Sequence, residues 1–458
     1  MSLLRKRPIG DCNADTGLKR VLGALDLTFL GVGAIIGAGI FVLTGIAAAT
    51  QAGPAIVLSF VLAGFVCVLA ALSYAELAAV VGGSGSAYGY AYVVLGELIA
   101  WIIGWALILE YCIGVSAVAI GWSGYFASGM QAIGVPLPTE FVTAPHAGGI
   151  VNLPAIVIIL LLMVLLCIGV TASKWVNAVA VLIKLAVVTL FIVVAIGNVK
   201  AENWSDFMPF GLSGVVGGAA LIFYAYLGFD AVSTAAEEAR NPQRDLPIGI
   251  VASLIVCTAL YILVAGLLTG VVHYSTLNNA SPVAQAMLSL GYTWFAGLIA
   301  FGAICGLTTV MLVVYYGGTR ILLAMSRDGL LPPALSRIHP RTRTPIPIIV
   351  GVGIVLCGVA GFAPITSVVE MANIGTLTAF VAVCIGVIVL RYRRPDLHRP
   401  FRTPFMPVLP ALGVAGCVWL MVNLKVQTWI YFLIWMAIGL TIYFGYSMRS
   451  SLLARQPG

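Results

Sequence analysis

The chain has 458 residues, of which 61% are hydrophobic and only 9% are charged. Soluble domains carry about 25% charged residues, so the composition excludes a soluble enzyme, a nucleic-acid-binding protein and a disordered chain. The mean hydropathy of +1.09 and the net charge of +7 instead indicate a membrane protein whose cations lie in its loops. Because about 20 apolar residues cross the bilayer as a helix, the chain has room for about a dozen spans.

Apolar stretches bounded by Gly, Pro or charged residues predict the membrane-spanning helices. Twelve such stretches lie, in chain order, at 27–50, 54–80, 88–118, 153–172, 176–197, 212–236, 246–272, 292–324, 346–363, 369–390, 408–424 and 429–447. The predicted fold class is therefore an all-α polytopic membrane protein with 12 transmembrane helices. Residues 1–26 are expected to form a cytoplasmic N-terminal segment, and residues 448–458 a cytoplasmic tail.

The distribution of cations predicts the orientation. If the N-terminus is cytoplasmic, all but three of the 23 Lys and Arg residues fall on the cytoplasmic side, whereas Lys200 and Lys425 lie on the outer side. Cytoplasmic loops are enriched in Lys and Arg, so both termini are expected in the cytoplasm and the protein in the plasma (inner) membrane. The third cation, Lys184, lies inside a span.

The first stretch carries four glycines within residues 31–39, near the middle of a membrane helix. Such glycines either allow close helix packing or mark a break in the helix. The sixth stretch favours a break, because tyrosines, Gly228 and Asp230 interrupt its apolar run at residues 223–230. The first and sixth helices would then be equivalent members of two repeats.

Interruptions at these two places predict five-helix repeats at 27–197 and 212–391, followed by two further helices at 408–447. After five crossings the chain is on the opposite face, so the second copy must be inverted, as in inverted-repeat transporters. Peptide groups without helical partners are tolerated in the membrane only where they line a cavity or meet a ligand. A zwitterionic amino acid would satisfy exposed N–H and C=O groups together.

Lys184 lies about eight residues into the fifth stretch, or about 12 Å from its cytoplasmic start. Its side chain could extend to the inner interface. Otherwise burial disfavours its charged form, and a lysine that gains and loses a proton there could carry a coupling ion.

Two carboxylates also lie in predicted spans. Glu110 is deep in the third stretch, where it could contact a substrate amine or a cationic side chain, or bond to a neighbouring backbone group. Asp230 follows the break in the sixth stretch and could cap the next half-helix or bind substrate.

Several kinds of chemistry find no support in the sequence. The four histidines, at 146, 273, 339 and 398, all fall in predicted loops, which leaves no axial ligands for a haem inside the membrane. No Gly-x4-Gly-Lys-Ser/Thr phosphate loop occurs. We therefore expect no enzymatic activity, no cofactor and no metal, and we expect any transport to be driven by a gradient.

Five motifs together resemble the amino acid, polyamine and organocation (APC) superfamily, in its cationic amino acid transporter branch. They are Gly33-Ala-Ile-Ile-Gly37-Ala-Gly39-Ile-Phe41, Tyr74-Ala-Glu76-Leu with Ser84-Gly-Ser86-Ala-Tyr88, the segment from Phe223 to Asp230, Glu238-Ala-Arg240-Asn-Pro242, and Ala324-Met-Ser326-Arg-Asp328-Gly. The resemblance implies a leucine-transporter-type fold of five plus five inverted helices with two extra helices. It also implies that helices 1 and 6 are broken at the midplane and that the protein works by alternating access.

The resemblance further implies which residues bind an amino acid. The carboxylate would meet the N–H groups of Ala38, Gly39 and Ile40, and the ammonium would meet carbonyls at Ile35 and around Tyr224. Neighbouring positions would complete the site, namely Gly37, Phe223, Ala225 and Tyr226.

Proton-coupled relatives carry a lysine in the fifth helix where sodium-coupled ones bind sodium. The resemblance therefore implies that a protonated Lys184 bonds carbonyls near Gly33 and a hydroxyl of Thr308 or Thr309. The expected partners are the amino acid, protons and the lipid bilayer, without nucleic acid; a monomer is consistent with the sequence.

The side chain of the substrate is less determined. Met311 would present an apolar surface, and Glu110 is the only deep carboxylate placed for a cationic side chain. A broad carrier of neutral L-amino acids such as alanine is favoured over a carrier of arginine, lysine or polyamines. The further alternatives are an uncoupled exchanger or sensor, and the major facilitator plan, whose charged loop between the second and third helices is replaced here by the uncharged residues 82–88.

Overall fold

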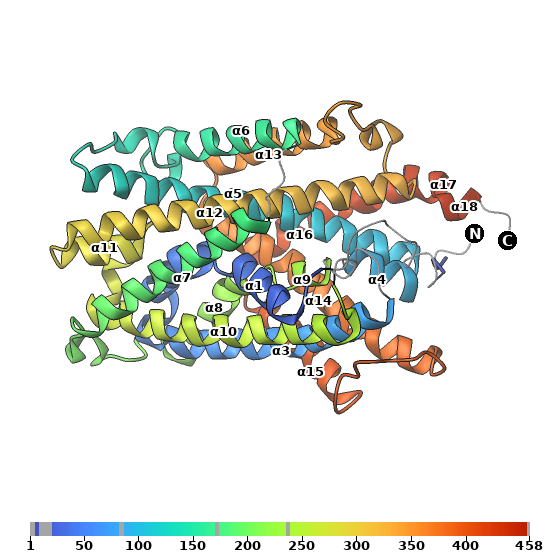
Figure 1. Ribbon diagram of the computed structural model, residues 1–458, viewed down its shortest axis with the longest axis horizontal. Helices are drawn as coiled ribbons and strands as arrows, with labels where there is room; N and C mark the ends of the chain where they lie inside the picture. The colour runs from blue at the N-terminus through green and yellow to red at the C-terminus, as the bar shows by residue number, and fades with distance from the viewer. Residues whose placement is uncertain (1–4, 9–20, 82–86, 170–173, 235–238, 456–458) are drawn as a thin grey trace.

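A computed structural model describes residues 5–8, 21–81, 87–169, 174–234 and 239–455. These residues form helices and loops, with one isolated β-bridge between Leu22 and Ala239. Most of the long helices lie side by side along the longest axis of the molecule (Figure 1). The predicted all-α class is confirmed.

The helices follow the predicted apolar stretches along the chain. Their bounds are α1 Ala24–Ile35, α2 Thr44–Ala47, α3 Ile56–Val81, α4 Ala87–Val94, α5 Glu97–Ala132, α6 Leu153–Ile168, α7 Lys174–Ile196, α8 Gly211–Ile222, α9 Ala231–Thr234, α10 Pro242–Val271, α11 Pro282–Ser289, α12 Thr293–Arg327, α13 Ile346–Phe362, α14 Ile365–Arg393, α15 Val408–Val422, α16 Val426–Ile442, α17 Met448–Ser450 and α18 Leu452–Arg455. Each predicted stretch overlaps at least one of these helices.

Seven helical stretches in the described chain are long and apolar enough to cross a membrane, and five shorter apolar helices accompany them. Large apolar side chains lie exposed on the outside, as Leu161, Val193 and Leu433 do on α6, α7 and α16. Meanwhile charged side chains such as Glu76 and Lys184 are buried. An exterior this rich in large apolar side chains is expected where lipid replaces water.

Helix α5 extends 14 residues beyond the predicted stretch 88–118. The added segment, 119–132, is rich in Gly, Ser and Ala, so its hydropathy falls although nothing in it breaks a helix. The helix ends only at Ala132, and it is followed by Ile133 and by Gly134 with its positive φ of 82°. Hydropathy therefore located this helix but underestimated its length.

The first predicted break is present. Helix α1 ends at Ile35, and Ile36 adopts an extended ψ of 99°. The chain becomes helical again at Gly39 with the π-helical turn η2 (Gly39–Leu43), which continues into α2. Such turns occur often at functional sites.

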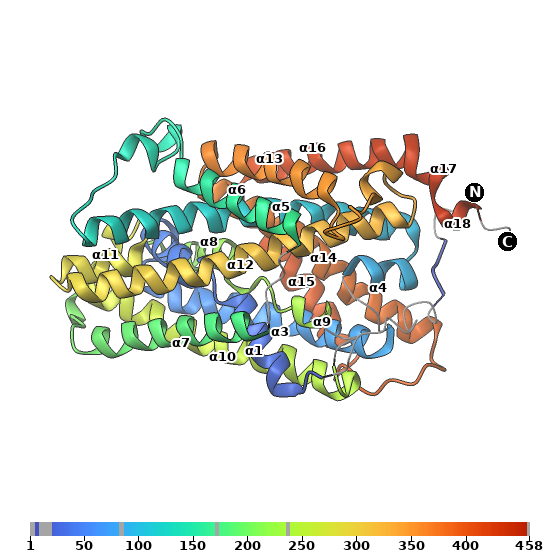
Figure 2. The same ribbon diagram turned by 45° about the horizontal axis from the view of Figure 1, so that its top comes forward.

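The second predicted break is also present. Helix α8 tightens into the 3₁₀ turn η8 (Phe223–Tyr226), and Leu227 then leaves helical geometry with a ψ of 137°. Gly228 has a φ of 110°, a value that L side chains rarely adopt, and α9 begins at Ala231. Helices α8 and α9 lie within the bundle in both views (Figures 1 and 2).

Candidate functional site

The two breaks lie directly against each other. A Cβ atom added to Gly39 would collide with the backbone of Ala225 in η8. On the other side of the contact, a Cβ at Gly228 would lie 2.9 Å from the carbonyl of Ala34. Glycine is therefore required at both positions because backbone meets backbone. The sequence predicted two breaks, and the structure brings them together.

The break in the first helix leaves N–H groups at a helix start. Ala38 precedes η2, and Gly39 and Ile40 are its first two residues. The first N–H groups of a helix have no acceptor within it. All three residues are buried, so these predicted carboxylate-binding groups lie inside the bundle.

A tyrosine that sequence reasoning missed joins the two breaks. The Tyr261 hydroxyl on α10 lies 2.8 Å from the carbonyl oxygens of both Ile35 and Ala225. Ile35 was predicted to offer this carbonyl to a substrate ammonium, and in the structure the tyrosine already contacts it. The signal available in the sequence was a lone tyrosine within the apolar stretch 246–272.

A buried asparagine, also missed, supports the second break. Asn373 on α14 donates through its side-chain amide to the carbonyls of Ala220 and Leu221, at 2.8 and 3.0 Å. These carbonyls belong to the last turn of α8, where a helix has no partners of its own. The Asn373 Oδ1 atom has no hydrogen-bond partner among the described residues.

Lys184 on α7 reaches the first break. Its Nζ donates a hydrogen bond of 2.7 Å to the carbonyl of Gly33, and its side chain is 1% exposed. The stem passes Gly306 on α12 so closely that a Cβ there would lie 2.8 Å from Lys184 Cγ. The lysine therefore does not extend to the inner interface, and it joins α7, α12 and the broken first helix.

The two threonines predicted to join Lys184 have other partners. Thr308 donates to the carbonyl of Ile304 at 2.7 Å and accepts from the Trp122 indole at 2.9 Å. Thr309 donates to the carbonyl of Gly306 at 2.8 Å. Threonine hydroxyls in helices often bond back to the preceding turn, and no hydrogen bond joins either one to Lys184 in the described structure. In this conformation, the expected Lys184–threonine contact is absent.

The aromatic residues of the sixth helix anchor the second break to its neighbours. Tyr224 donates to the carbonyl of Gly114 on α5 at 2.7 Å, and Tyr226 to the carbonyl of Phe60 on α3 at 2.8 Å. Phe223 packs edge to face on an aromatic ring of α14, with centroids 5.7 Å apart. The hydroxyl of Tyr224 thus holds its ring toward α5.

Glu110 is buried, and its Oε2 has no hydrogen-bond partner in the described residues. It interacts electrostatically with Asp230, which accepts a 3.0 Å hydrogen bond from Tyr111. Two carboxylates therefore lie near the second break. The sequence analysis had placed Glu110 in the third stretch and Asp230 in the sixth, without predicting that they lie close together. Asp230 is the residue that ends this break, just before α9.

Met311 is buried on α12. Its neighbour Val310, however, is the side chain of α12 that lies next to Gly37 in the first break. A Cβ on Gly37 would lie at an ordinary 3.5 Å from the Val310 methyl groups. The predicted substrate and coupling residues on both breaks, from Ile35 to Ile40 and from Phe223 to Tyr226, are at most 8% exposed. The arrangement is closed to solvent, so access to it requires a conformational change.

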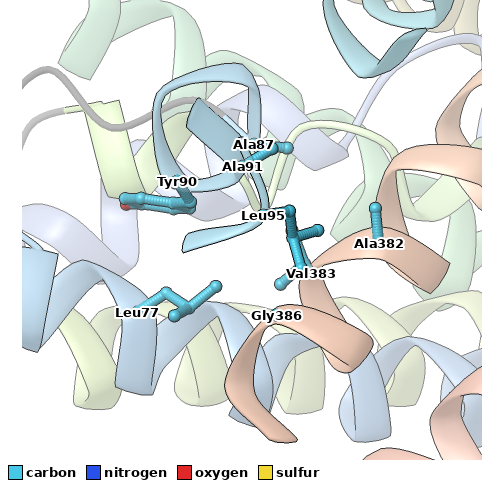
Figure 3. Close-up of a pocket in the computed structure, with 8 residues that line it drawn as sticks. All are labelled: Leu77, Ala87, Tyr90, Ala91, Leu95, Ala382, Val383 and Gly386. Carbon is cyan, nitrogen blue, oxygen red and sulfur yellow. The ribbon is translucent and has the colours of Figure 1, made fainter. Parts of the chain in front are cut away.

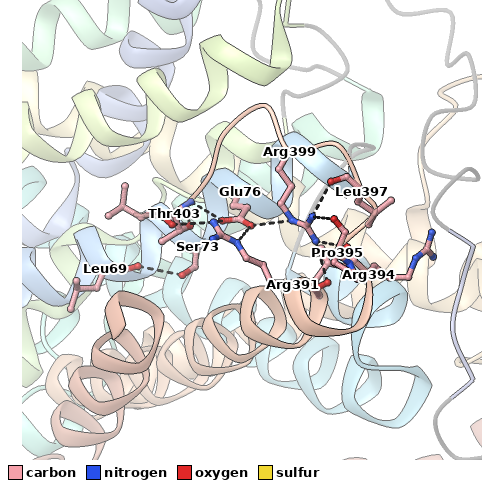
Figure 4. A network of polar contacts seen from close by, with 11 residues as sticks. Leu69, Ser73, Glu76, Arg391, Arg394, Pro395, Leu397, Arg399 and Thr403 are labelled. Atoms are coloured by element: carbon pink, nitrogen blue, oxygen red, sulfur yellow. Dashed lines mark hydrogen bonds and ion pairs between the residues drawn. The ribbon is translucent and has the colours of Figure 1, made fainter. Parts of the chain in front are cut away.

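A second buried polar cluster lies away from the breaks (Figure 4). Glu76 on α3 accepts two hydrogen bonds from Arg391, at 2.8 and 2.7 Å, and one from the backbone N–H of Thr403, at 2.7 Å. Arg399 adds a 3.6 Å ion pair. Since both carboxylate oxygens are satisfied, this cluster ties α3 to the end of α14 and to the loop before α15.

Comparison with known proteins identifies the family of the chain. The profile of the family described as amino acid permease matches residues 22–445. The chain is 49% identical to the methylthioribose transporter of Bacillus subtilis (strain 168) and 50% identical to the branched-chain amino acid permease BcaP of the same organism, in each case over 99% of both chains. It is 32% identical to the human cationic amino acid transporter 4, over 98% of this chain and 90% of the relative.

Two of the motifs that carried the resemblance lie partly outside the described residues, at Ser84–Ser86 and at Glu238. The first motif and the segment from Phe223 to Asp230 form the two breaks, and the motif from Ala324 lies at the end of α12. The profile match covers most of the chain. The chain belongs to the amino acid permease family of the APC superfamily.

Proposed function

We propose that the protein is a proton-coupled symporter of L-amino acids that works by alternating access. The observation that carries the proposal is the hydrogen bond from Lys184 Nζ to the Gly33 carbonyl, inside the closed bundle and beside the broken first helix. A cation held there stabilises carbonyl groups that have lost helical partners. Loss of its proton removes the charge and weakens this contact.

The coupling follows from this contact. Protonation of Lys184 from the outer side would hold α7 against the first helix, and release to the inner side would free the two elements to separate. Each proton that enters with the substrate adds about 2.3 kcal/mol per 100 mV of membrane potential. This energy is available to concentrate an amino acid.

The two breaks supply groups for an amino acid backbone. We assign the carboxylate to the N–H groups of Ala38, Gly39 and Ile40, and the ammonium to the carbonyls of Ile35 and Ala225 after the Tyr261 hydroxyl moves away. The remaining surroundings, including Ile40 and Met311, are apolar. A neutral aliphatic side chain fits them, and a branched-chain permease is among the relatives.

We also propose the architecture on which alternating access depends. Residues 27–197 and 212–391 form two inverted five-helix repeats, and residues 408–447 form two further helices, which gives 12 membrane-spanning helices. Both termini lie in the cytoplasm, and the protein resides in the plasma membrane. The cation distribution supports this orientation.

Purified protein in proteoliposomes tests the proposal. An inward proton gradient alone should concentrate radiolabelled alanine or leucine, and a protonophore should abolish the accumulation. Equal accumulation with and without the gradient would reject coupling and leave an exchanger or sensor. A thermal-stability screen over the twenty amino acids and methylthioribose identifies the substrate, since a ligand stabilises the state that binds it.

One observation favours a second substrate class. Among the described residues, the buried Glu110 Oε2 atom has no hydrogen-bond partner, and a guanidinium or ammonium group of a cationic substrate would satisfy it. Cationic amino acid transporters are also among the relatives. Stabilisation by arginine, lysine or a polyamine but not by leucine would replace the neutral substrate with a cationic one.

A further inference from the structure

A hollow of about 380 Å³ lies at one end of the bundle, between residues 6–8, the end of α4 and the end of α14. Four cations line its rim, namely Lys6, Arg7, Arg393 and Arg394. Its floor is apolar and is formed by two valines of α4 and by Val389 and Leu390 of α14. The hollow is separate from both helix breaks and plays no part in the proposed transport chemistry.

The positive charge of the hollow is only partly neutralised. Arg7 lies 3.8 Å from Asp328, and Arg394 lies 3.2 Å from Asp396. Lys6 and Arg393 form no ion pair with the acids of the described chain. Burial, followed by the nearby Arg393 charge, lowers the pKa of Lys6 from its ordinary value. The cations therefore repel one another, and an anion between them would relieve that repulsion.

The end of α14 would ordinarily disfavour an anion, because the last carbonyls of a helix carry partial negative charge. Here Arg399 removes that obstacle. Its guanidinium donates to the carbonyls of Leu390 and Arg394 at 3.2 and 2.6 Å, and to two further carbonyls in the turn that follows. The cations at the rim consequently remain available to an external ligand.

The hollow opens from an apolar seam between α4 and α14. Farther along the seam, Ala87, Ala91 and Val383 line a small space that has no room for a water molecule (Figure 3). Beside the hollow, Tyr392 is 72% exposed. Tyrosines are enriched where membrane meets water, so this exposed ring favours a position of the hollow near the lipid headgroups.

We propose that this hollow binds the phosphate of an anionic phospholipid, with Lys6, Arg7, Arg393 and Arg394 around the phosphate and the apolar floor beneath the glycerol and first methylene groups. Basic pockets between membrane helices are suited to such headgroups. Free phosphate would leave the floor unused. A zwitterionic lipid would bring an ammonium group into a cationic rim.

The test uses the full chain in detergent, titrated separately with dioctanoyl phosphatidylglycerol, dioctanoyl phosphatidylcholine and inorganic phosphate. Binding is followed by native mass spectrometry and by thermal stability. The double variant K6A/R393A removes the two cations without acidic partners, and both side chains are exposed. R337A/R341A is the matched control, because it removes two exposed arginines that line no part of the hollow.

Phosphatidylglycerol should bind the native chain and the control equally and should bind K6A/R393A at least threefold more weakly. The single variant R393K, which keeps the charge, should bind within twofold of the native chain. Equal affinities of the native chain and K6A/R393A would overturn the site. Equal stabilisation by inorganic phosphate, or by phosphatidylcholine, would overturn the assignment to an anionic lipid.

Discussion

Glu76 on α3 and Glu110 on α5 are both buried, at 1% and 5% exposure, but their surroundings differ. Glu76 accepts hydrogen bonds on both oxygens and faces two arginines. Glu110 has an oxygen without a hydrogen-bond partner in the part of the chain that the structure describes, and it interacts with a second carboxylate, Asp230. Full satisfaction rigidifies a buried polar network, whereas an unsatisfied one is costly, so we assign Glu76 to stability and the Glu110 region to function.

Replacing Glu76 should give the largest effect on stability. E76A leaves Arg391 and the nearly buried Arg399 without their carboxylate, and breaking a buried ion pair costs roughly 3–5 kcal/mol. Unfolding in detergent, followed by circular dichroism, measures this. E202A, which removes an exposed carboxylate with no ion pair in the described chain, is the control. A decrease of less than about 1 kcal/mol in the free energy of unfolding of E76A would contradict the structural role assigned to Glu76 but not to Glu110.

Variants of Lys184 test the functional region of this comparison. K184R keeps a cation beside Gly33 but cannot release a proton, and K184A removes the cation. Both should reduce proton-driven accumulation at least about tenfold, equivalent to about 1.4 kcal/mol, while K200A, at an exposed lysine, should behave like the native chain. Proteoliposome uptake is the measurement, and undiminished accumulation in K184R would exclude proton release from this lysine.

Tyr261 tests whether the breaks are a binding site. Y261F should destabilise the free protein by about 1 kcal/mol through loss of its hydrogen bonds. It should also increase the thermal stabilisation by substrate, because the substrate ammonium no longer displaces a hydroxyl. Y315F is the control, since it removes a buried tyrosine bond to the Ile349 carbonyl away from the breaks. The same substrate-induced shift in both variants would contradict the assignment.

The smallest effect on stability is expected at Glu110. E110Q removes a charge that faces Asp230 and has an unpartnered oxygen, so the free energy of unfolding should change by less than about 1 kcal/mol in either direction. Competition assays then separate the substrate classes: arginine should lose affinity relative to leucine only if Glu110 binds a cationic side chain. Destabilisation as large as that of E76A would make both carboxylates structural.

Local sequence patterns located both breaks and most of the helices. They missed α11 (Pro282–Ser289), which lies between two predicted stretches, and the division of the stretch 88–118 into α4 and α5. Glycines at 31–39 and the tyrosines around Gly228 marked the interruptions, because these residues stand out in an apolar run. The contact between Lys184 and Gly33 was implied by the family resemblance and could not follow from spacing, since 151 residues separate the two positions.

Other contacts could not be read from the sequence for a physical reason. Tyr261 and Asn373 act through partners on distant segments, so their roles depend on tertiary packing. Thr308 lies on the helix predicted to supply a hydroxyl to Lys184, but its hydroxyl donates to the preceding turn of its own helix. Which acceptor a hydroxyl chooses is decided by rotamer and packing, which hydropathy does not encode.

The position of Tyr261 has a consequence for the two carbonyls that it contacts. Its hydroxyl has one proton, yet two carbonyls lie 2.8 Å from its oxygen. One of them is therefore short of a donor at any instant. An arriving ammonium carries three protons, so it can satisfy both carbonyls together and release the tyrosine. Binding of the substrate would thus supply donors to carbonyls on two helices that are far apart in the chain, and this would favour closure of both helices around it.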